Sequence, residues 1–140
     1  MRNAIFVTCL LFASAVAGDT SYYLCEADKA TGFKYKDGSW KSTNFNVSKH
    51  RYVLRRPKQG DTFKSSAWVW SQLGEDFALA GCTNEANEDG FIYCAGYENL
   101  LLNTKSLRYQ SYYSLGYVTS DGSNTSGDTP YIEIGHCSEM

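Results

Sequence analysis

The stretch "AGCTNEANEDGFIYCAG", residues 80–96, holds two cysteines twelve positions apart, each flanked by small residues. If Cys82 bonds to Cys94, Gly81 falls directly opposite Ala95. Small side chains at such positions let two β-strands approach closely around a disulfide. The stretch therefore predicts two neighbouring strands that are joined by an acidic loop and held by a Cys82–Cys94 bridge.

The same loop also carries part of a calcium-binding pattern. Counted from Glu85, Gly90 stands in the sixth place and Ile92 in the eighth, as in a calcium loop of the EF-hand type. The twelfth place, which needs a bidentate glutamate, is Gly96, and the flanks read as strands rather than helices. Zinc is disfavoured because the sequence contains no C-x-x-C pair. We therefore expect no metal site and no cofactor.

The N-terminus has the pattern of a secretory signal peptide over residues 1–17, with Arg2, an apolar run and small residues at Ala15 and Ala17. Cleavage would remove one of 13 basic residues and none of 15 acidic ones, leaving a single domain over 18–140 with a net charge of −3. The apolar run is short for a bilayer span. We expect a periplasmic or secreted protein with no membrane insertion after cleavage, and its acidic balance disfavours nucleic acid as a partner.

Four cysteines remain after removal of the signal peptide, and an even number in an exported chain of this size predicts disulfides. Four cysteines allow three pairings, and their number does not choose among them. The small residues around the inner two favour Cys82–Cys94, and by elimination Cys25 then pairs with Cys137. That second bridge would tie the first strand to the last and close a barrel.

The rest of the chain predicts an all-β fold, because aromatic and β-branched residues are frequent and no long segment has helical periodicity. About nine short strands joined by tight turns indicate a small antiparallel meander that forms a barrel or a strongly curved sheet, with a sandwich as the alternative. The expected strands cover 21–27, 32–45 (a hairpin turning at Asp37-Gly38), 51–56, 67–73, 77–82, 91–97, 99–103, 107–113, 116–120 and 129–137. Any helix is expected to be short, at 59–66 or 83–88. The basic cluster from Lys49 to Lys58 alternates like the charged face of a strand.

Candidate catalytic residues are few, and we assign none. His136 adjoins Cys137, but neighbours in a strand point to opposite faces, which argues against a nucleophile–base pair. The carboxylates available to a hydrolase are Glu75, Asp76, Glu98 and Glu133. Glu133 alternates with two isoleucines near the end of the chain and could face a barrel interior or solvent. A pocket with two convergent carboxylates would favour the hydrolase over a binding domain.

Four tyrosines crowd one segment and form a candidate recognition surface: Tyr109, Tyr112, Tyr113 and Tyr117. Tyrosine offers a large contact area at low entropic cost, although cross-strand pairing within a sheet is the ordinary explanation. The leading interpretation is an exported, non-catalytic binding or interaction domain for an unknown protein or small-molecule ligand. A small secreted hydrolase that uses carboxylates is the alternative.

Several segments carry a resemblance that spans Tyr22 to Cys137: "YLCEADKATGFKY", "GSWK", "RYVLRRP", "GFIYCAGY", "LRYQSYY" and "DTPYIEIGHC". On these segments the chain resembles a group of small uncharacterised exported bacterial proteins. The resemblance implies an exported bacterial domain and supplies no activity. The short "GSW" at 38–40 is also similar to the G-x-W found on an early strand of lipocalin and avidin barrels, which favours a barrel.

Overall fold

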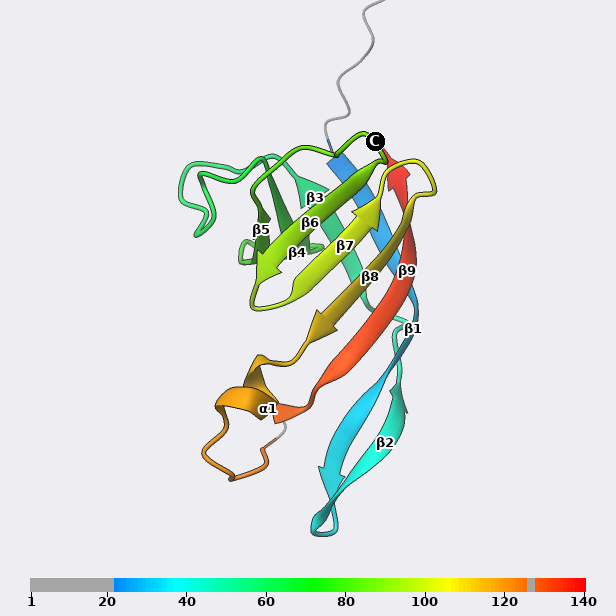
Figure 1. Ribbon diagram of the computed structural model, residues 1–140, viewed down its shortest axis with the longest axis vertical. Helices are drawn as coiled ribbons and strands as arrows, with labels where there is room; N and C mark the ends of the chain where they lie inside the picture. Colours follow the sequence, from blue (N-terminus) through cyan, green and yellow to red (C-terminus); the bar gives the residue numbers. More distant parts are fainter. Residues whose placement is uncertain (1–21, 126–127) are drawn as a thin grey trace, which may run out of the picture.

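The computed structural model describes residues 22–125 and 128–140, so the expected signal peptide over residues 1–17 lies outside the described residues. Within the described part, nine strands and one short helix follow one another (Figure 1). They are β1 (Tyr22–Lys36), β2 (Ser39–Phe45), β3 (Arg51–Arg55), β4 (Trp68–Gln72), β5 (Ala78–Cys82), β6 (Phe91–Gly96), β7 (Asn99–Asn103), β8 (Arg108–Tyr113), α1 (Leu115–Thr119) and β9 (Tyr131–Glu139). Eight strands close into an antiparallel barrel in the order β1-β3-β4-β5-β6-β7-β8-β9, with β9 pairing back to β1. The expected all-β barrel is confirmed.

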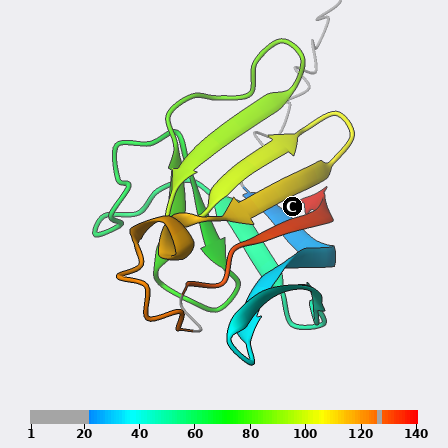
Figure 2. The ribbon, with the colours of Figure 1, turned by 60° about the horizontal axis from the view of Figure 1, so that its bottom comes forward.

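The first strand is longer than the sequence predicted, because β1 runs unbroken through residues expected to separate two strands. Its first half lies between β3 and β9, and its second half pairs with β2. Asp37 and Gly38, with φ of 53° and 76°, form the predicted turn between β1 and β2. This hairpin extends beyond the barrel at the end where α1 also lies (Figures 1 and 2).

A β-bulge in β1 decides which residues face the barrel interior. The register against β9 shifts between Ala27 and Lys29, so Asp28 is an extra residue in the ladder. One extra residue moves the alternation of side chains by one position. Ala30 is consequently buried and pairs with the buried Glu133 of β9.

Both predicted disulfides are present. Cys25–Cys137 joins β1 to β9 where the barrel closes, and Cys82–Cys94 joins β5 to β6. Gly81 pairs with Ala95, as the small residues around the inner cysteines predicted. Two disulfides indicate an oxidising, extracellular-type environment.

The loop between β3 and β4 folds back over the outside of the barrel. Arg55 donates two hydrogen bonds to Asp61, of 2.8 and 3.0 Å, and holds the start of this loop. Phe63 then covers β5 so closely that a Cβ added at Gly81 would lie 2.7 Å from the Cβ of Phe63. The three arginines of the basic cluster are all paired, since Arg51 also binds Glu26 and Arg56 binds Glu85. Its alternation along β3 is confirmed by the burial pattern of that strand.

The expected strand at 116–120 is wrong, because α1 occupies most of that segment. The physical reason is closure: β8 and β9 already pair from Arg108 to Tyr113, so the barrel leaves no free edge for another strand. α1 instead lies against the hairpin, where Tyr117 packs on Trp40 with ring centroids 5.2 Å apart. Neither 59–66 nor 83–88 is helical; both form turns and irregular loops.

The barrel interior has an apolar half and a polar half. The apolar half contains both disulfides and the fully buried Leu54, Ile92 and Leu102. The polar half lies toward the hairpin, where the register sets Ala30, Glu133 and Ser111 side by side across three strands. Tyr52, Trp70 and Tyr109 fill the space between the two halves; the rings of Tyr52 and Trp70 are stacked, and that of Tyr109 is tilted against Trp70.

Candidate functional site

Glu133 is a fully enclosed carboxylate, with 0% of the residue exposed. It faces inward because it lies four residues before Cys137 on the same strand, and residues at even spacing share a face. The Tyr109 hydroxyl donates to its Oε1 at 2.9 Å, and Nδ1 of His50 donates to its Oε2 at 2.5 Å. The ring of Tyr109 fits there because residue 135 is glycine, whose added Cβ would overlap Cε1 of that ring. Both oxygens of Glu133 are therefore bound by protein groups.

His50 links this buried carboxylate to the surface. It lies just before β3, and 33% of its side chain is exposed. Because Nδ1 is held by Glu133, the other ring nitrogen, Nε2, is the one that remains for a further partner. No described residue forms a hydrogen bond with Nε2.

Glu98 is the second buried carboxylate, at the turn between β6 and β7, with 7% of the residue exposed. The Tyr131 hydroxyl donates to its Oε1. Its Oε2 has no hydrogen-bond partner among the described residues; the indole N–H of Trp70 lies near the carboxyl but makes no hydrogen bond of normal geometry. Burial raises the pKa of Glu98 above its ordinary value, against the lowering by Tyr131 and Trp70, and the charge of Glu133 raises it further.

These groups meet at a pocket in the end of the barrel that faces the hairpin, which we call the mouth pocket. It has a volume of about 530 Å³ and is lined by Ala30, Lys34, Phe45, Asn46, His50, Glu98, Tyr113, Thr129 and Tyr131. One wall is aromatic, since the ring of Tyr131 lies 6.1 Å from that of Phe45 and 6.0 Å from that of Tyr113. Burial raises the pKa of the Tyr131 hydroxyl, and the charge of Glu98 adds to the rise, so the phenol remains a neutral donor.

The structure brings together two of the four carboxylates that the sequence offered. Glu98 and Glu133 are close enough for their charges to interact, whereas Glu75 and Asp76 are exposed in the loop between β4 and β5. Only Glu98 lines the mouth pocket, because Glu133 is sealed behind His50 and Tyr109. The pocket is thus lined by one carboxyl, that of Glu98, and not by a convergent pair.

The four tyrosines of the candidate recognition surface do not share one surface. Tyr109 is buried inside the barrel, where it binds Glu133. Tyr112 is exposed on the outer face of β8, and Tyr117 is exposed on α1. Tyr113 lines the mouth pocket, so it is the member of the group that lies at the candidate site.

The acidic loop between Cys82 and Cys94 uses its polar groups for structure. Glu85 binds Arg56 and also accepts a 2.8 Å hydrogen bond from the indole N–H of Trp68. The side-chain oxygen of Asn87 accepts from the backbone of Asp89 and Phe91. Across residues 22–125 and 128–140, the structure places no three His, Cys, Asp or Glu side chains where they could hold a metal ion.

His136 and Cys137 diverge as their adjacent positions predicted. Cys137 is buried in a disulfide, and His136 points outward, where Nδ1 lies 3.0 Å from a carboxylate oxygen of Asp28. Both side chains of that ion pair are more than half exposed. His136 therefore belongs to the solvated outer surface.

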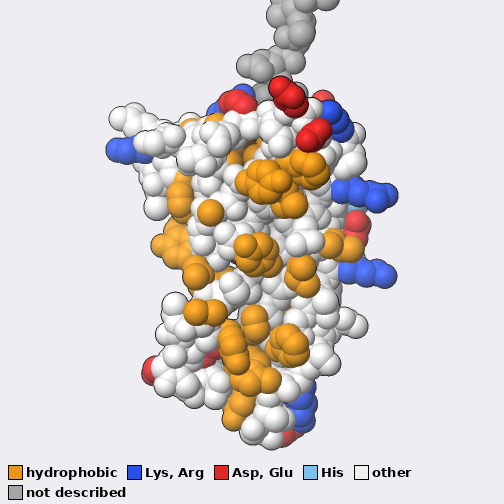
Figure 3. Space-filling view, in the orientation of Figure 1, with side chains coloured by type: hydrophobic (Ala, Val, Ile, Leu, Met, Phe, Trp, Pro, Cys, Tyr) orange, Lys and Arg blue, Asp and Glu red, His pale blue; other side chains and the backbone are white. Residues whose placement is uncertain are grey.

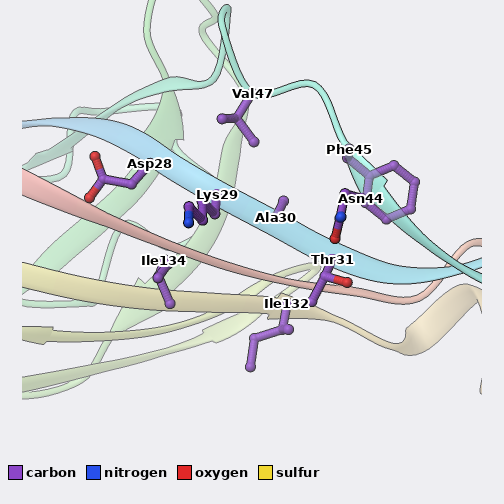
Figure 4. Close-up of a pocket in the computed structure, with 9 residues that line it drawn as sticks. All are labelled: Asp28, Lys29, Ala30, Thr31, Asn44, Phe45, Val47, Ile132 and Ile134. Carbon is purple, nitrogen blue, oxygen red and sulfur yellow. The ribbon is translucent and has the colours of Figure 1, made fainter.

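On two other parts of the surface, polar side chains do not converge on one point. A groove of about 610 Å³ runs beside β1, and Figure 4 shows Ile132 and Ile134 on one side of the strand and Val47 and Phe45 on the other. Apolar side chains also gather on the outer face of β6 to β9 (Figure 3), including Tyr93, Tyr112, Ile132 and Ile134. The polar Gln110 stands in register between Leu101 and Ile134 and interrupts that face.

No protein-family model, curated protein or solved structure matches the chain. None of the helical segments that the structure describes is both long and apolar enough to cross a bilayer. What the candidate site can bind is therefore inferred from its own residues and distances.

Sequence reasoning missed His50 and Tyr131 as members of the site. A signal for Glu133 was present, because an inward Cys137 fixes the inward face of β9 at every second residue. The same argument from the buried Leu100 and Leu102 of β7 points Glu98 inward.

Proposed function

We propose that the protein is an exported, non-catalytic binding domain whose ligand site is the mouth pocket. The observation that carries this proposal is the carboxyl of Glu98, which belongs to a residue that is 7% exposed and lines the pocket, and whose Oε2 has no hydrogen bond of normal geometry. A buried polar atom without a partner is costly, and a bound ligand can satisfy it. The pocket volume of about 530 Å³ suits a small molecule.

Export is part of this proposal. The signal-peptide pattern over residues 1–17 and the resemblance to small exported bacterial proteins support it, together with two disulfides that need an oxidising compartment. Mass spectrometry of protein recovered from the periplasm or medium of a bacterial host should show a chain that begins near Gly18. A soluble product that retains Met1 would refute export.

The test of the site is an NMR fragment screen against the oxidised protein, with neutral, cationic and anionic fragments in equal number. We expect the amide shifts caused by hits to cluster at His50, Glu98 and Tyr131. Hits that instead cluster on the outer face around Tyr93 and Ile134, or a screen without hits, would contradict the proposal.

A second candidate function is hydrolysis, and one observation favours it: a histidine oriented by a buried carboxylate stands at the same pocket as a carboxyl of raised pKa. In that case His50 would be the general base, Glu98 the general acid, and Glu133 a positioning residue. Hydrolysis of chromogenic esters or glycosides that both His50→Ala and Glu98→Gln abolish would favour this candidate. Hydrolysis that survives either change would exclude this pair as its machinery.

A further inference from the structure

The chemistry of the mouth pocket indicates the class of its ligand, and this inference rests on the proposed function. The most buried polar side chain of the pocket lining is Glu98, whose Oε1 accepts from Tyr131 and whose Oε2 has no hydrogen bond of normal geometry, although the indole N–H of Trp70 lies near. A second carboxylate, Glu133, lies behind it and acts on it electrostatically. The floor of the pocket therefore attracts a hydrogen-bond donor and repels an anion.

The wall of the pocket adds a second preference. Tyr131 lies between Phe45 and Tyr113, with ring centroids 6.1 and 6.0 Å away. Aromatic faces attract organic cations, most strongly where water is excluded, and they also cover the apolar body of a ligand. The carboxyl of Glu98 and the aromatic wall together favour a ligand that has a positively charged group on an apolar body.

The two basic side chains of the site, His50 and Lys34, do not form an ion pair with Glu98. His50 directs Nδ1 at Glu133 and forms no hydrogen bond with Glu98, although its charge acts on Glu98. Lys34 lines the pocket but is exposed on the part of β1 that extends past the barrel, and it forms no ion pair with any described residue. Its long side chain can turn toward the pocket or toward solvent, so Lys34 competes with a cationic ligand.

We propose that the mouth pocket binds a small organic cation, a primary amine on an aromatic or aliphatic body, with its ammonium group at the carboxyl of Glu98 and its body against Phe45, Tyr113 and Tyr131. A bound ammonium group supplies a charged donor to this buried carboxyl and offsets its negative charge. A neutral alcohol supplies the donor without the charge, and a carboxylate ligand supplies neither.

The test compares three probes that share one body: phenethylamine, 2-phenylethanol and phenylacetate, titrated calorimetrically into the oxidised protein at pH 7. We expect phenethylamine to bind about tenfold or more tightly than 2-phenylethanol, since a hydrogen bond to a charged group is about twice as strong as a neutral one. Phenylacetate should bind most weakly. Equal or tighter binding of phenylacetate would overturn the inference.

Two variants with matched controls locate the effect. Glu98→Gln should remove the preference for the amine over the alcohol, whereas Glu75→Gln, at an exposed position, should keep it. Lys34→Met should strengthen amine binding about twofold or more by removing a competing cation, whereas Lys36→Met, on the same strand but outside the pocket lining, should not. Weaker amine binding in Lys34→Met, or an unchanged preference in Glu98→Gln, would overturn the inference.

The outcomes separate this inference from the proposed function. If the alcohol or phenylacetate binds at the mouth pocket at least as tightly as the amine, the pocket remains a ligand site and the cation is wrong. If none of the three probes binds, the cation is again refuted. The fragment screen then decides on its own whether the pocket binds small molecules.

Discussion

Nδ1 of His50 lies 2.5 Å from Oε2 of Glu133, and it joins a partly exposed ring to a carboxylate that has no exposure at all. A carboxylate in such a position needs every hydrogen bond it receives, because water does not reach it. The pair therefore serves two purposes. It keeps the charge of Glu133 tolerable inside the barrel, and it holds the ring of His50 at the mouth pocket.

Removal of His50 is expected to destabilise the fold. In His50→Ala, Tyr109 remains a donor to Glu133, Tyr52 lies beside the same carboxyl, and Oε2 loses the hydrogen bond from His50. The free energy of unfolding should therefore fall by about 2 kcal/mol, below the range for a fully buried pair. Urea denaturation measures the change. The matched control is His136→Ala, whose ion pair with Asp28 is more than half exposed on both sides; it should change stability by less than about 0.5 kcal/mol. Equal losses in the two variants would contradict a structural role for the buried pair.

The raised pKa of Glu98 predicts how the stability of the fold depends on pH. Its pKa is raised on folding, so its contribution is fully present below the ordinary value of 4.5 and is lost as pH rises through the folded value. Glu98→Gln cannot ionise, and it should gain stability relative to the wild type as the pH is raised from 4 to 8. Unfolding curves across that range test this, with Glu75→Gln as the control that should run parallel to the wild type. A constant difference between wild type and Glu98→Gln would contradict the raised pKa.

The lowered pKa of Asp61 predicts the opposite dependence of stability on pH. Hydrogen bonds from Arg55 lower the pKa of Asp61 to about 2, against a smaller opposing effect of burial, and the backbone N–H of Lys58 contributes as well. Only 5% of the Asp61 side chain is exposed, so Asp61→Asn should cost about 2 kcal/mol at pH 7. The cost should disappear as the pH falls from the ordinary value of 3.8 toward 2. Denaturation of both proteins at pH 7 and pH 2.5 measures this, and a loss that is the same at both values would contradict the ion pair as its cause.

The two disulfides should differ in how much they stabilise the fold. Cys25–Cys137 closes a loop with a sequence separation of 112, and Cys82–Cys94 one of 12. In the chain-entropy model these loops correspond to about 5 and about 3 kcal/mol. Replacing both cysteines of each pair by serine, one pair at a time, should therefore lower the melting temperature more for the barrel-closing bridge. A larger loss from the Cys82–Cys94 pair would contradict this order.

Local patterns predicted much of this fold. The turn at Asp37-Gly38, the register of Gly81 with Ala95 and both disulfides follow from residues that lie near one another in the sequence or from the count of cysteines. The strand expected at 116–120 fails because closure of the barrel removes the edge it would need, and closure is a property of the whole chain.

The site was harder to predict because its members come from distant segments. His50 and Glu133 are 83 residues apart, and Glu98 and Tyr131 are 33 apart. Alternation along β9 and β7 indicates that Glu133 and Glu98 face inward, but it does not indicate how far along the barrel each one lies. The position of each residue along the barrel depends on the stagger between strands and on the bulge at Asp28. No local pattern in the sequence predicts that bulge.

The carboxyl carbon of Glu98 reports on the proposed cation site, and NMR can observe it in protein labelled with ¹³C at its glutamate carboxyls, with Glu98→Gln to assign its signal. As phenethylamine is added at pH 7, we expect a saturable shift of the Glu98 signal, while the signal of Glu75 does not move. A Glu98 signal that does not respond while the amine binds elsewhere, or that responds equally to phenylacetate, would contradict the claim that the mouth pocket is a site for organic cations.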